Sequence, residues 1–169
     1  MPGAQLVSNQ PKYNALHRII EAEVVPTSRE LGISQVVFSP IDQGILTGKY
    51  KPGQPAPEGS RATDTTGGAN FIKGSLKDEV LTRVQQLAPL AEAEGLSMAQ
   101  LAVAWVLQND NVASAITGGS RPEQITANVE AAGKKLSAET LAGIDDALGD
   151  AVQRDGSVVG KASPTERLT

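Results

Sequence analysis

Three short apolar runs, each followed closely by a proline or by paired glycines, constrain the fold of this chain more than any other feature. The first covers residues 5–8 and ends near Gln10, before Pro11. The second covers residues 35–38 before Pro40, and the third covers residues 112–116 before a pair of glycines. β-branched and aromatic residues favour strands, and proline interrupts a ladder. Helical segments separate the runs, so the sequence predicts an α/β fold with a parallel sheet.

Apolar residues at helical spacing fill most of the remaining chain. Glycines at the ends, serines at the starts and a capping box mark the helix boundaries. The expected helices cover residues 21–31, closed by Gly32; residues 76–91 as one helix, closed by Gly95; a helix after the capping box of Ser97 and Gln100; residues 122–132; and a helix that Ser137 caps.

Residues 42–74 contain many Gly, Pro, Ser and Thr and have no sustained apolar period. An irregular segment of this length is unusual in a compact domain unless it is functional. Residues 1–150 are therefore expected to form one domain with a long functional loop. Residues 151–169 are polar and aperiodic, which predicts a flexible C-terminal tail.

Composition narrows the classes of function. The 15 basic and 19 acidic residues give a net charge of −4 and are scattered, which disfavours binding to nucleic acid or to an anionic membrane. The chain has no cysteine, so disulfides and thiolate chemistry are excluded. No apolar run approaches the roughly 20 residues of a membrane span, and the first ten residues do not resemble a signal peptide. We expect a cytoplasmic protein.

The segment Gly118-Gly119-Ser120 lies between the third strand and a helix. Backbone N–H groups and the helix dipole could hold a phosphate there, although a tight turn without a ligand gives the same pattern. Arg121 could meet an additional phosphate. Gln124 and Asn128 share one helix face, which could contact a base or ribose or be a solvated polar face.

Other candidate residues have equally simple structural interpretations. Phe38 could stack on a flat ring or belong to the core. Lys49 and Arg61 lie in the long loop, which could close over anionic groups, or they could be solvated. His17 is the only histidine and lacks a convincing acid or nucleophile partner, so we expect a surface or packing residue. No metal site is expected.

Three motifs stand out along the chain: residues 8–14 (SNQPKYN), residues 38–50 (FSPIDQGILTGKY), and residues 118–124 (GGSRPEQ) with Asn128. Their sequences and their order resemble those of the aldo-keto reductases. The chain resembles this family from about Leu6 to Leu148, particularly the branch of potassium-channel β-subunits and bacterial reductases. The resemblance implies a partial (β/α)8 TIM barrel, about its last three β/α units (strands 6–8) plus a C-terminal helix, with the motifs on the catalytic face.

The resemblance also implies an NADP(H) site, starting with its nicotinamide end. Gln10 would hydrogen-bond the nicotinamide amide, and Phe38 would stack on its ring. Lys49 and Arg61 would fold over the dinucleotide. The residues that would follow the pyrophosphate are Ser39, Pro40, Ile41 and Gln43.

At the other end, Gly118 and Ser120 would flank the 2′-phosphate and ribose, with Arg121 nearby. Gln124 and Asn128 would hold the adenine. This cluster favours NADP over NAD. Ala127 departs from the pattern, since several relatives have a glutamate there that contacts the adenine.

The family's catalytic Asp, Tyr, Lys and His come from the first four strands, whereas the resemblance here begins near the sixth. No catalytic residue is therefore assigned, and Tyr13 and Tyr50 belong to other motifs. We expect a truncated or half-barrel reductase chain that is inactive alone. The alternatives are a non-catalytic NADP-binding or regulatory module, like channel β-subunits, and a self-assembling half-barrel without ligand. Three parallel strands cannot close a barrel, so self-association or a complementary N-terminal half-barrel is expected.

Overall fold

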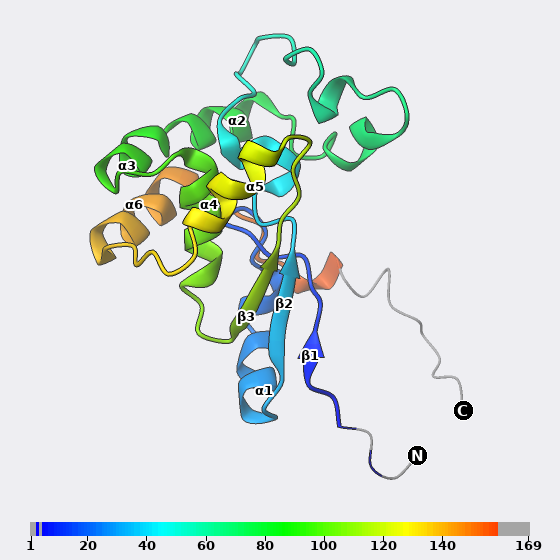
Figure 1. The fold of residues 1–169 in the computed structure, drawn as a ribbon, viewed down its shortest axis with the longest axis vertical. Helices are drawn as coiled ribbons and strands as arrows, with labels where there is room; N and C mark the ends of the chain where they lie inside the picture. The colour runs from blue at the N-terminus through cyan, green and yellow to red at the C-terminus, as the bar shows by residue number, and fades with distance from the viewer. Residues whose placement is uncertain (1–2, 4, 159–169) are drawn as a thin grey trace.

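The computed structural model describes residues 3 and 5–158 and contains a parallel sheet of three strands in the order β1-β2-β3 (Figure 1). The strands are β1 (Ser8–Asn9), β2 (Ser34–Phe38) and β3 (Val112–Ile116). This confirms the predicted strands and the α/β class. Pairing resumes after Pro11, whose carbonyl accepts from the Phe38 N–H at 3.0 Å, and Lys12 bridges to Phe38. The proline interrupts the ladder without ending it.

Within the described residues, six α-helices connect and flank the strands. They are α1 (Val24–Glu30), α2 (Asp78–Gln85), α3 (Ala88–Ala93), α4 (Met98–Leu107), α5 (Pro122–Glu130) and α6 (Ala138–Leu148). The capping box is confirmed, because the side chains of Ser97 and Gln100 each bond the other's backbone N–H. The single helix expected over residues 76–91 is wrong. Pro89, in the first turn of α3, has no N–H with which to continue the ladder of α2.

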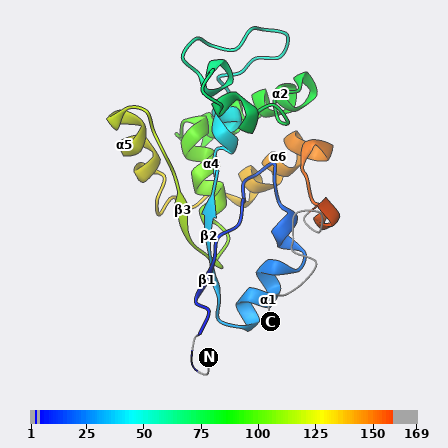
Figure 2. The same cartoon turned by 90° about the vertical axis from the view of Figure 1, so that its right-hand side faces the viewer.

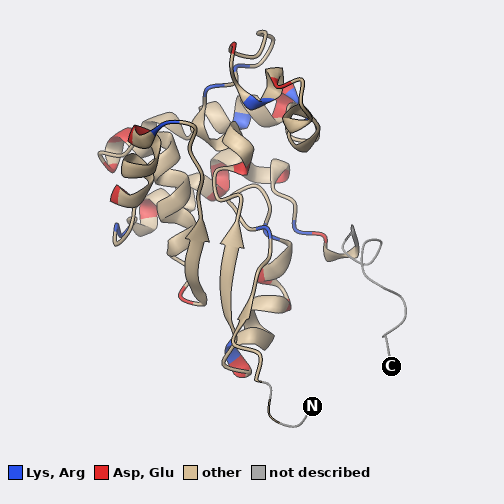
Figure 3. Cartoon of the chain, turned by 45° about the vertical axis from the view of Figure 1, so that its right-hand side comes forward, with Lys and Arg blue, Asp and Glu red and all other residues tan. Residues whose placement is uncertain are grey.

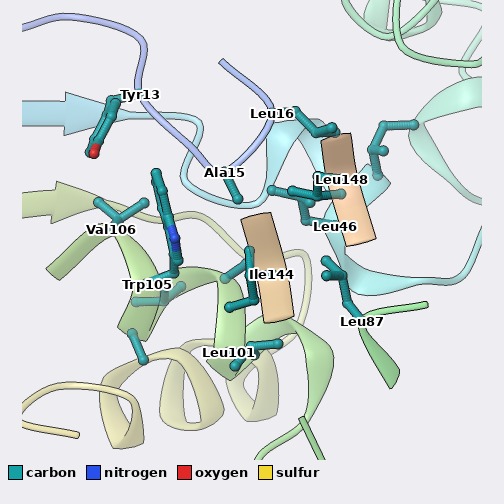
Figure 4. Packing of buried hydrophobic residues seen from close by; sticks show 14 of the residues in the cluster. Tyr13, Ala15, Leu16, Leu46, Leu87, Leu101, Trp105, Val106, Ile144 and Leu148 are labelled. Atoms are coloured by element: carbon teal, nitrogen blue, oxygen red, sulfur yellow. The ribbon is translucent and has the colours of Figure 1, made fainter. Parts of the chain in front are cut away.

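The hydrophobic core is centred on α4, in which residues 101–106 are all buried. This helix contacts β3, α3 and α5. The Trp105 and Tyr13 ring centroids lie 5.2 Å apart (Figure 4). The Arg18 guanidinium lies 4.4 Å from the Trp105 ring centroid. Ile144 and Leu148 bring α6 against the same core. The helical core therefore includes Tyr13, which belongs to the first motif.

The two faces of the sheet differ in exposure. Gln35 and Val37 on β2 are completely buried, whereas Phe38 on the opposite face is 40% exposed. Ile116, which pairs with Phe38 across the two strands, is 44% exposed. Figure 2 shows α1 and α6 on the same side of the strands. One face therefore carries the core, and the other is open at the carboxyl ends of the strands.

Residues 51–75 form an arm that projects from one end of the molecule (Figure 1). As expected, the arm is irregular, with only the short 3-10 helices Arg61–Thr63 and Gly68–Phe71. Asp64 organises its tip by accepting hydrogen bonds from the Thr66 and Gly68 N–H groups at 2.8 and 3.0 Å. Hydrogen bonds from Thr66 lower the pKa of this carboxyl.

The expected flexible tail lies only partly within the described residues, because residues 159–169 are outside them. Gln153 donates its N–H to the Leu16 carbonyl at 2.8 Å, and its own carbonyl accepts from Arg18 at 2.9 Å. Arg154 forms an ion pair with Glu21 at 3.1 Å. The start of this segment is therefore attached to the loop that follows the first motif.

None of the single helices in the described part of the chain has the length and apolar character needed to cross a bilayer. The bent pair Asp78–Ala93 and Met98–Leu107 has them only when its two parts are taken together.

Candidate functional site

The predicted site residues fall mainly into two turns that leave neighbouring strands at the same edge of the sheet. Residues 39–48 follow β2 and are called the β2 turn; residues 117–121 follow β3 and are called the β3 turn. Phe38 and Ile116 are register partners in the parallel ladder. Because parallel strands run in the same direction, both turns begin side by side at the carboxyl edge. Ligands of open parallel sheets bind at this edge.

The β2 turn has an unusual backbone. Ser39, Asp42 and Gln43 have φ angles of 57°, 44° and 59°, in the left-handed region that L-residues avoid. The turn is held internally by a hydrogen bond from Gln43 Nε2 to Ser39 Oγ at 2.6 Å. Three such residues within five positions must be maintained by the surrounding structure, and strain of this kind concentrates at ligand sites.

A buried asparagine from the first motif supplies much of that support. Asn14 is completely buried and donates Nδ2 to the Ser39 carbonyl at 2.9 Å and to Asp42 Oδ1 at 3.3 Å. Its Oδ1 accepts from the N–H groups of Leu16 and His17 at 3.0 and 2.9 Å. The amide therefore uses its full hydrogen-bonding capacity. It connects the first motif to the second.

The carboxylate of Asp42, only 2% exposed, forms an ion pair with Lys12 Nζ at 2.8 Å. Lys12, Asn14 and Asp42 were not predicted as functional residues. Asp42 lies 28 or more residues from the other two along the chain, and no local pattern signals its contacts with them. The only available signal is that all three lie inside the recognised motifs.

The residues predicted for the nicotinamide end lie on the accessible side of the strands. Gln10 is exposed directly after β1, and Phe38 ends β2 with its ring partly open to solvent. Lys49 is exposed and folds back over Gly44, where an added Cβ would lie 3.0 Å from Lys49 Cε. Its Nζ lies 5.2 Å from the Tyr50 ring centroid. The structure brings these residues to one end of the sheet.

The β3 turn is open in comparison. Gly118, Ser120 and Arg121 are all exposed, and Arg121 is the N-cap residue of α5. Gln124 Oε1 accepts from the Ser120 N–H at 2.8 Å. Asn128, one turn further along α5, is only 6% exposed. The helix face that was expected to present both amides therefore offers Gln124 to solvent and holds Asn128 largely inside.

Arg61 is separate from both turns, because it begins a 3-10 helix in the projecting arm. Among the described residues, no hydrogen bond or ion pair joins its side chain to either turn. Figure 3 shows Lys and Arg positions both on the arm and beside the strand ends, mixed with acidic ones. The predicted role of Arg61 over a dinucleotide stays a prediction.

The two tyrosines are poorly suited to proton donation. Burial raises the pKa of Tyr13, whose hydroxyl donates to Glu21 Oε1 at 2.8 Å. A general acid near neutral pH needs a pKa close to the working pH, so this shift runs in the wrong direction. Tyr50 is 1% exposed, and its hydroxyl has no partner within the described part of the chain.

His17 is half-buried, with Nδ1 at 3.1 Å from Gln153 Oε1. Burial lowers its pKa, and the charge of nearby Lys12 lowers it further. Over residues 3 and 5–158, no group of three or more His, Asp or Glu side chains is arranged to hold a metal ion.

The family model described as the aldo/keto reductase family matches residues 1–148. The chain belongs to this family. A protein of Schizosaccharomyces pombe named as a voltage-gated potassium channel subunit beta is 41% identical over 146 residues, which cover 84% of this chain and 42% of the relative. An L-glyceraldehyde 3-phosphate reductase of Escherichia coli O157:H7 is 36% identical over 151 residues, 86% of this chain and 42% of that protein.

The fold of this aldo/keto reductase chain also matches a solved structure. The glycerol dehydrogenase from Gluconobacter oxydans superposes with a TM-score of 0.71 at 26% identity, covering 88% of this chain and 44% of that one. The neighbour has the family's TIM-barrel fold. The chain spans about two-fifths of the length of the curated relatives named above. Aldo/keto reductases generally use NAD(P)H, and one relative is named an NADH-specific methylglyoxal reductase.

Proposed function

We propose that this chain carries the NADP(H)-binding part of an aldo/keto reductase that reduces aldehydes or ketones. Residues 6–148 would correspond to the last three β/α units of the barrel, strands 6–8. The observation that carries the proposal is the pairing of two motif turns at the carboxyl edge of adjacent parallel strands, one of them already held in a strained shape. Preorganised turns of this kind lower the cost of ordering a ligand site.

The open face of the sheet supports the nicotinamide end of the proposed site. The Phe38 ring is exposed enough to stack on a flat ring, and Gln10 lies beyond the adjacent strand end. Hydride chemistry belongs to the cofactor, and the protein's part is to orient it. The β2 turn would follow the pyrophosphate, which would place Ser39 and Gln43 beside the phosphates.

The exposed β3 turn supports the proposed site for the 2′-phosphate end of NADP(H). Arg121 is exposed, and its guanidinium could form bidentate bonds to a phosphate, which would give NADP an advantage over NAD. The Ser120 N–H is held by Gln124, so a phosphate would replace one acceptor by another. The preference for NADP(H) is part of the proposal, because the family includes enzymes of either preference.

Titration of the purified chain with NADPH and NADH tests this function, with nucleotide fluorescence as the readout. NADPH should bind more tightly than NADH, and Arg121→Ala should weaken NADPH about tenfold while leaving NADH unchanged. Arg29→Ala, an exposed arginine on α1, is the matched control and should change neither affinity. The proposal fails if neither nucleotide binds, and the assignment of Arg121 fails if both affinities fall equally.

The chain alone should not reduce carbonyls at a useful rate, because the family's proton donor is absent from its matched motifs. General acid catalysis typically contributes about 10²–10⁴-fold, so its loss should be measurable in an assay with NADPH and a reactive aldehyde. Turnover at the rate of a complete reductase would contradict this. The regulatory alternative remains supported by the S. pombe relative named as a channel subunit, and NADPH binding without turnover fits both.

Self-association or a complementary half-barrel belongs to the same proposal. Beside β1, a mainly apolar groove of about 540 Å³ is lined by residues that include Leu6, Val24, Leu31 and Ile33. Leu6 and Leu31 are 74% and 63% exposed. These surfaces, together with the open sheet face, favour a partner that covers them. The cytoplasm, expected from the sequence, is the compartment that we propose for both. A strictly monomeric particle in sedimentation that unfolds in a single cooperative transition would count against this.

A further inference from the structure

A single buried carboxylate lies at the centre of the β2 turn, and neither the sequence motifs nor the family match assigns it a role. Asp42 has a φ of 44° and is 2% exposed, yet it is in contact with two residues of the first motif. Lys12 Nζ lies 2.8 Å from Oδ1, and Asn14 Nδ2 lies 3.3 Å from the same atom. A buried charge needs partners of this kind to be tolerated.

We propose that Lys12 and Asp42 form a positioning pair that holds the β2 turn in its left-handed conformation before any nucleotide arrives. The expected consequence, tighter binding of the nucleotide, rests on the proposed function. The positioning itself can be tested on the chain without nucleotide. Neither residue is assigned a contact with the cofactor. Both act through the backbone of residues 39–44.

The geometry shows how one ion pair controls several backbone groups. The Asp42 N–H donates to the Ser39 carbonyl at 3.0 Å, and that carbonyl also accepts from Asn14. The N–H groups of Gly44 and Leu46 both donate to the Ile41 carbonyl, at 3.0 and 3.2 Å. The ion pair with Lys12 therefore fixes the residue at the centre of these backbone hydrogen bonds. Without the ion pair, the turn would lose a contact that offsets the strain of its left-handed residues.

The charges of the pair make the positioning role distinguishable from a simple electrostatic one. Asp42→Asn keeps the size of the side chain and its tolerance of left-handed backbone. It removes the negative charge and replaces one carboxylate oxygen by an NH2 donor. Lys12 is 31% exposed and can return to water, so no charge is left buried. On electrostatics alone, one negative charge fewer should strengthen the binding of an anionic dinucleotide. Positioning predicts the opposite sign.

A conservative substitution is available at the other partner. A cavity of about 370 Å³, lined by residues that include Lys12, His17 and Asp42, gives room for a larger cation. Lys12→Arg should therefore preserve the ion pair, whereas Lys12→Met should break it and leave the carboxylate unpaired. Asp110→Asn, at an exposed ion pair with Arg29, is the matched control for loss of a surface carboxylate.

Hydrogen–deuterium exchange of the full chain, read by mass spectrometry, tests the pair without a ligand. In Asp42→Asn and Lys12→Met, exchange in peptides covering residues 38–50 should accelerate about tenfold or more, while peptides of α4 stay protected. Lys12→Arg and Asp110→Asn should match the wild type. NADPH affinity, measured on the same proteins, should fall about tenfold in Asp42→Asn.

Three results overturn the positioning role: unchanged exchange in the turn, equal acceleration throughout the chain, or tighter NADPH binding by Asp42→Asn. If the wild-type chain binds no nucleotide, but the two variants show locally accelerated exchange, the pair is supported and the proposed function is overturned. The two proposals therefore fail separately.

Discussion

The β2 turn and the β3 turn occupy equivalent places in the fold, yet their structures differ sharply. Each leaves a strand of the same sheet, each contains glycine, and each carries a recognised motif. The β2 turn has three left-handed non-glycine residues and is bonded to the buried Asn14. The β3 turn is exposed, and the Gln124 side chain holds the Ser120 N–H. One turn is fixed before a ligand arrives, and the other can adjust to one.

The difference comes from what covers each turn. The first motif passes over the β2 turn, and α4 lies beneath it, where Met98 approaches Gly48. Buried backbone groups there must be paired, so the conformation is fixed by many bonds at once. The β3 turn projects ahead of α5 into solvent, and water can replace any bond that it loses. Rigidity therefore follows burial and not the glycine content of the two turns.

Replacement of Asn14 by alanine should produce the largest effect, because it would remove the support on which the β2 turn depends. The Ser39 carbonyl and the N–H groups of Leu16 and His17 would lose their partner in a buried environment. The free energy of unfolding should fall by about 3 kcal/mol or more, measured by urea denaturation. Asn70→Ala, at an exposed position on the arm, should be nearly neutral. A loss of less than about 1 kcal/mol at Asn14 would show that the two turns do not differ in this way.

Alanine at one glycine of each turn compares their backbones directly. Gly48 has a φ of 72°, and an added Cβ would lie 2.5 Å from Met98 Sδ, whereas Gly118 has no atom within 4 Å of that position. The methionine end can move, but the left-handed φ remains unfavourable. Gly48→Ala should cost about 1–2 kcal/mol, and Gly118→Ala should change stability by less than about 0.5 kcal/mol. Equal thermal shifts for the two variants would contradict the comparison.

The smallest effect should come from His17, at the margin of the Asn14 network. Its pKa is lowered in the folded state, chiefly by burial. The unfolded chain therefore binds a proton first as the pH falls, so this contribution to stability is complete well above pH 6.5 and declines as the pH falls below that value. His17→Gln should flatten that part of the stability profile. An unchanged slope would mean that other groups cause it.

The fold was predictable where the signal is local. The three strands, the capping box of Ser97 and the helix capped by Ser137 all appear where short patterns place them. The apolar stripe over residues 76–91 misled the helix prediction, because both α2 and α3 use it on either side of the break near Pro89. Burial patterns report which face is covered, and they do not report whether the backbone ladder is continuous.

The candidate site was predictable in part. Gln10, Phe38 and the two motif turns do lie at one edge of the sheet, as motif order implied. Their roles toward a nucleotide stay predictions. The Asn14 and Lys12 contacts to Asp42 could not be inferred, since they join segments far apart in the chain. Gln124 and Asn128 illustrate the same limit, because helical spacing does not show which amide faces the interior.

The sequence alone indicated the three strands and most of the helices, and through its three motifs it indicated the aldo/keto reductase family. Such features depend on backbone preferences and on the order of residues along the chain. Only the tertiary structure decided which turn is rigid, which amide is buried and which carboxylate supports the β2 turn. These properties depend on contacts between distant segments, and burial makes each unpaired polar group there costly.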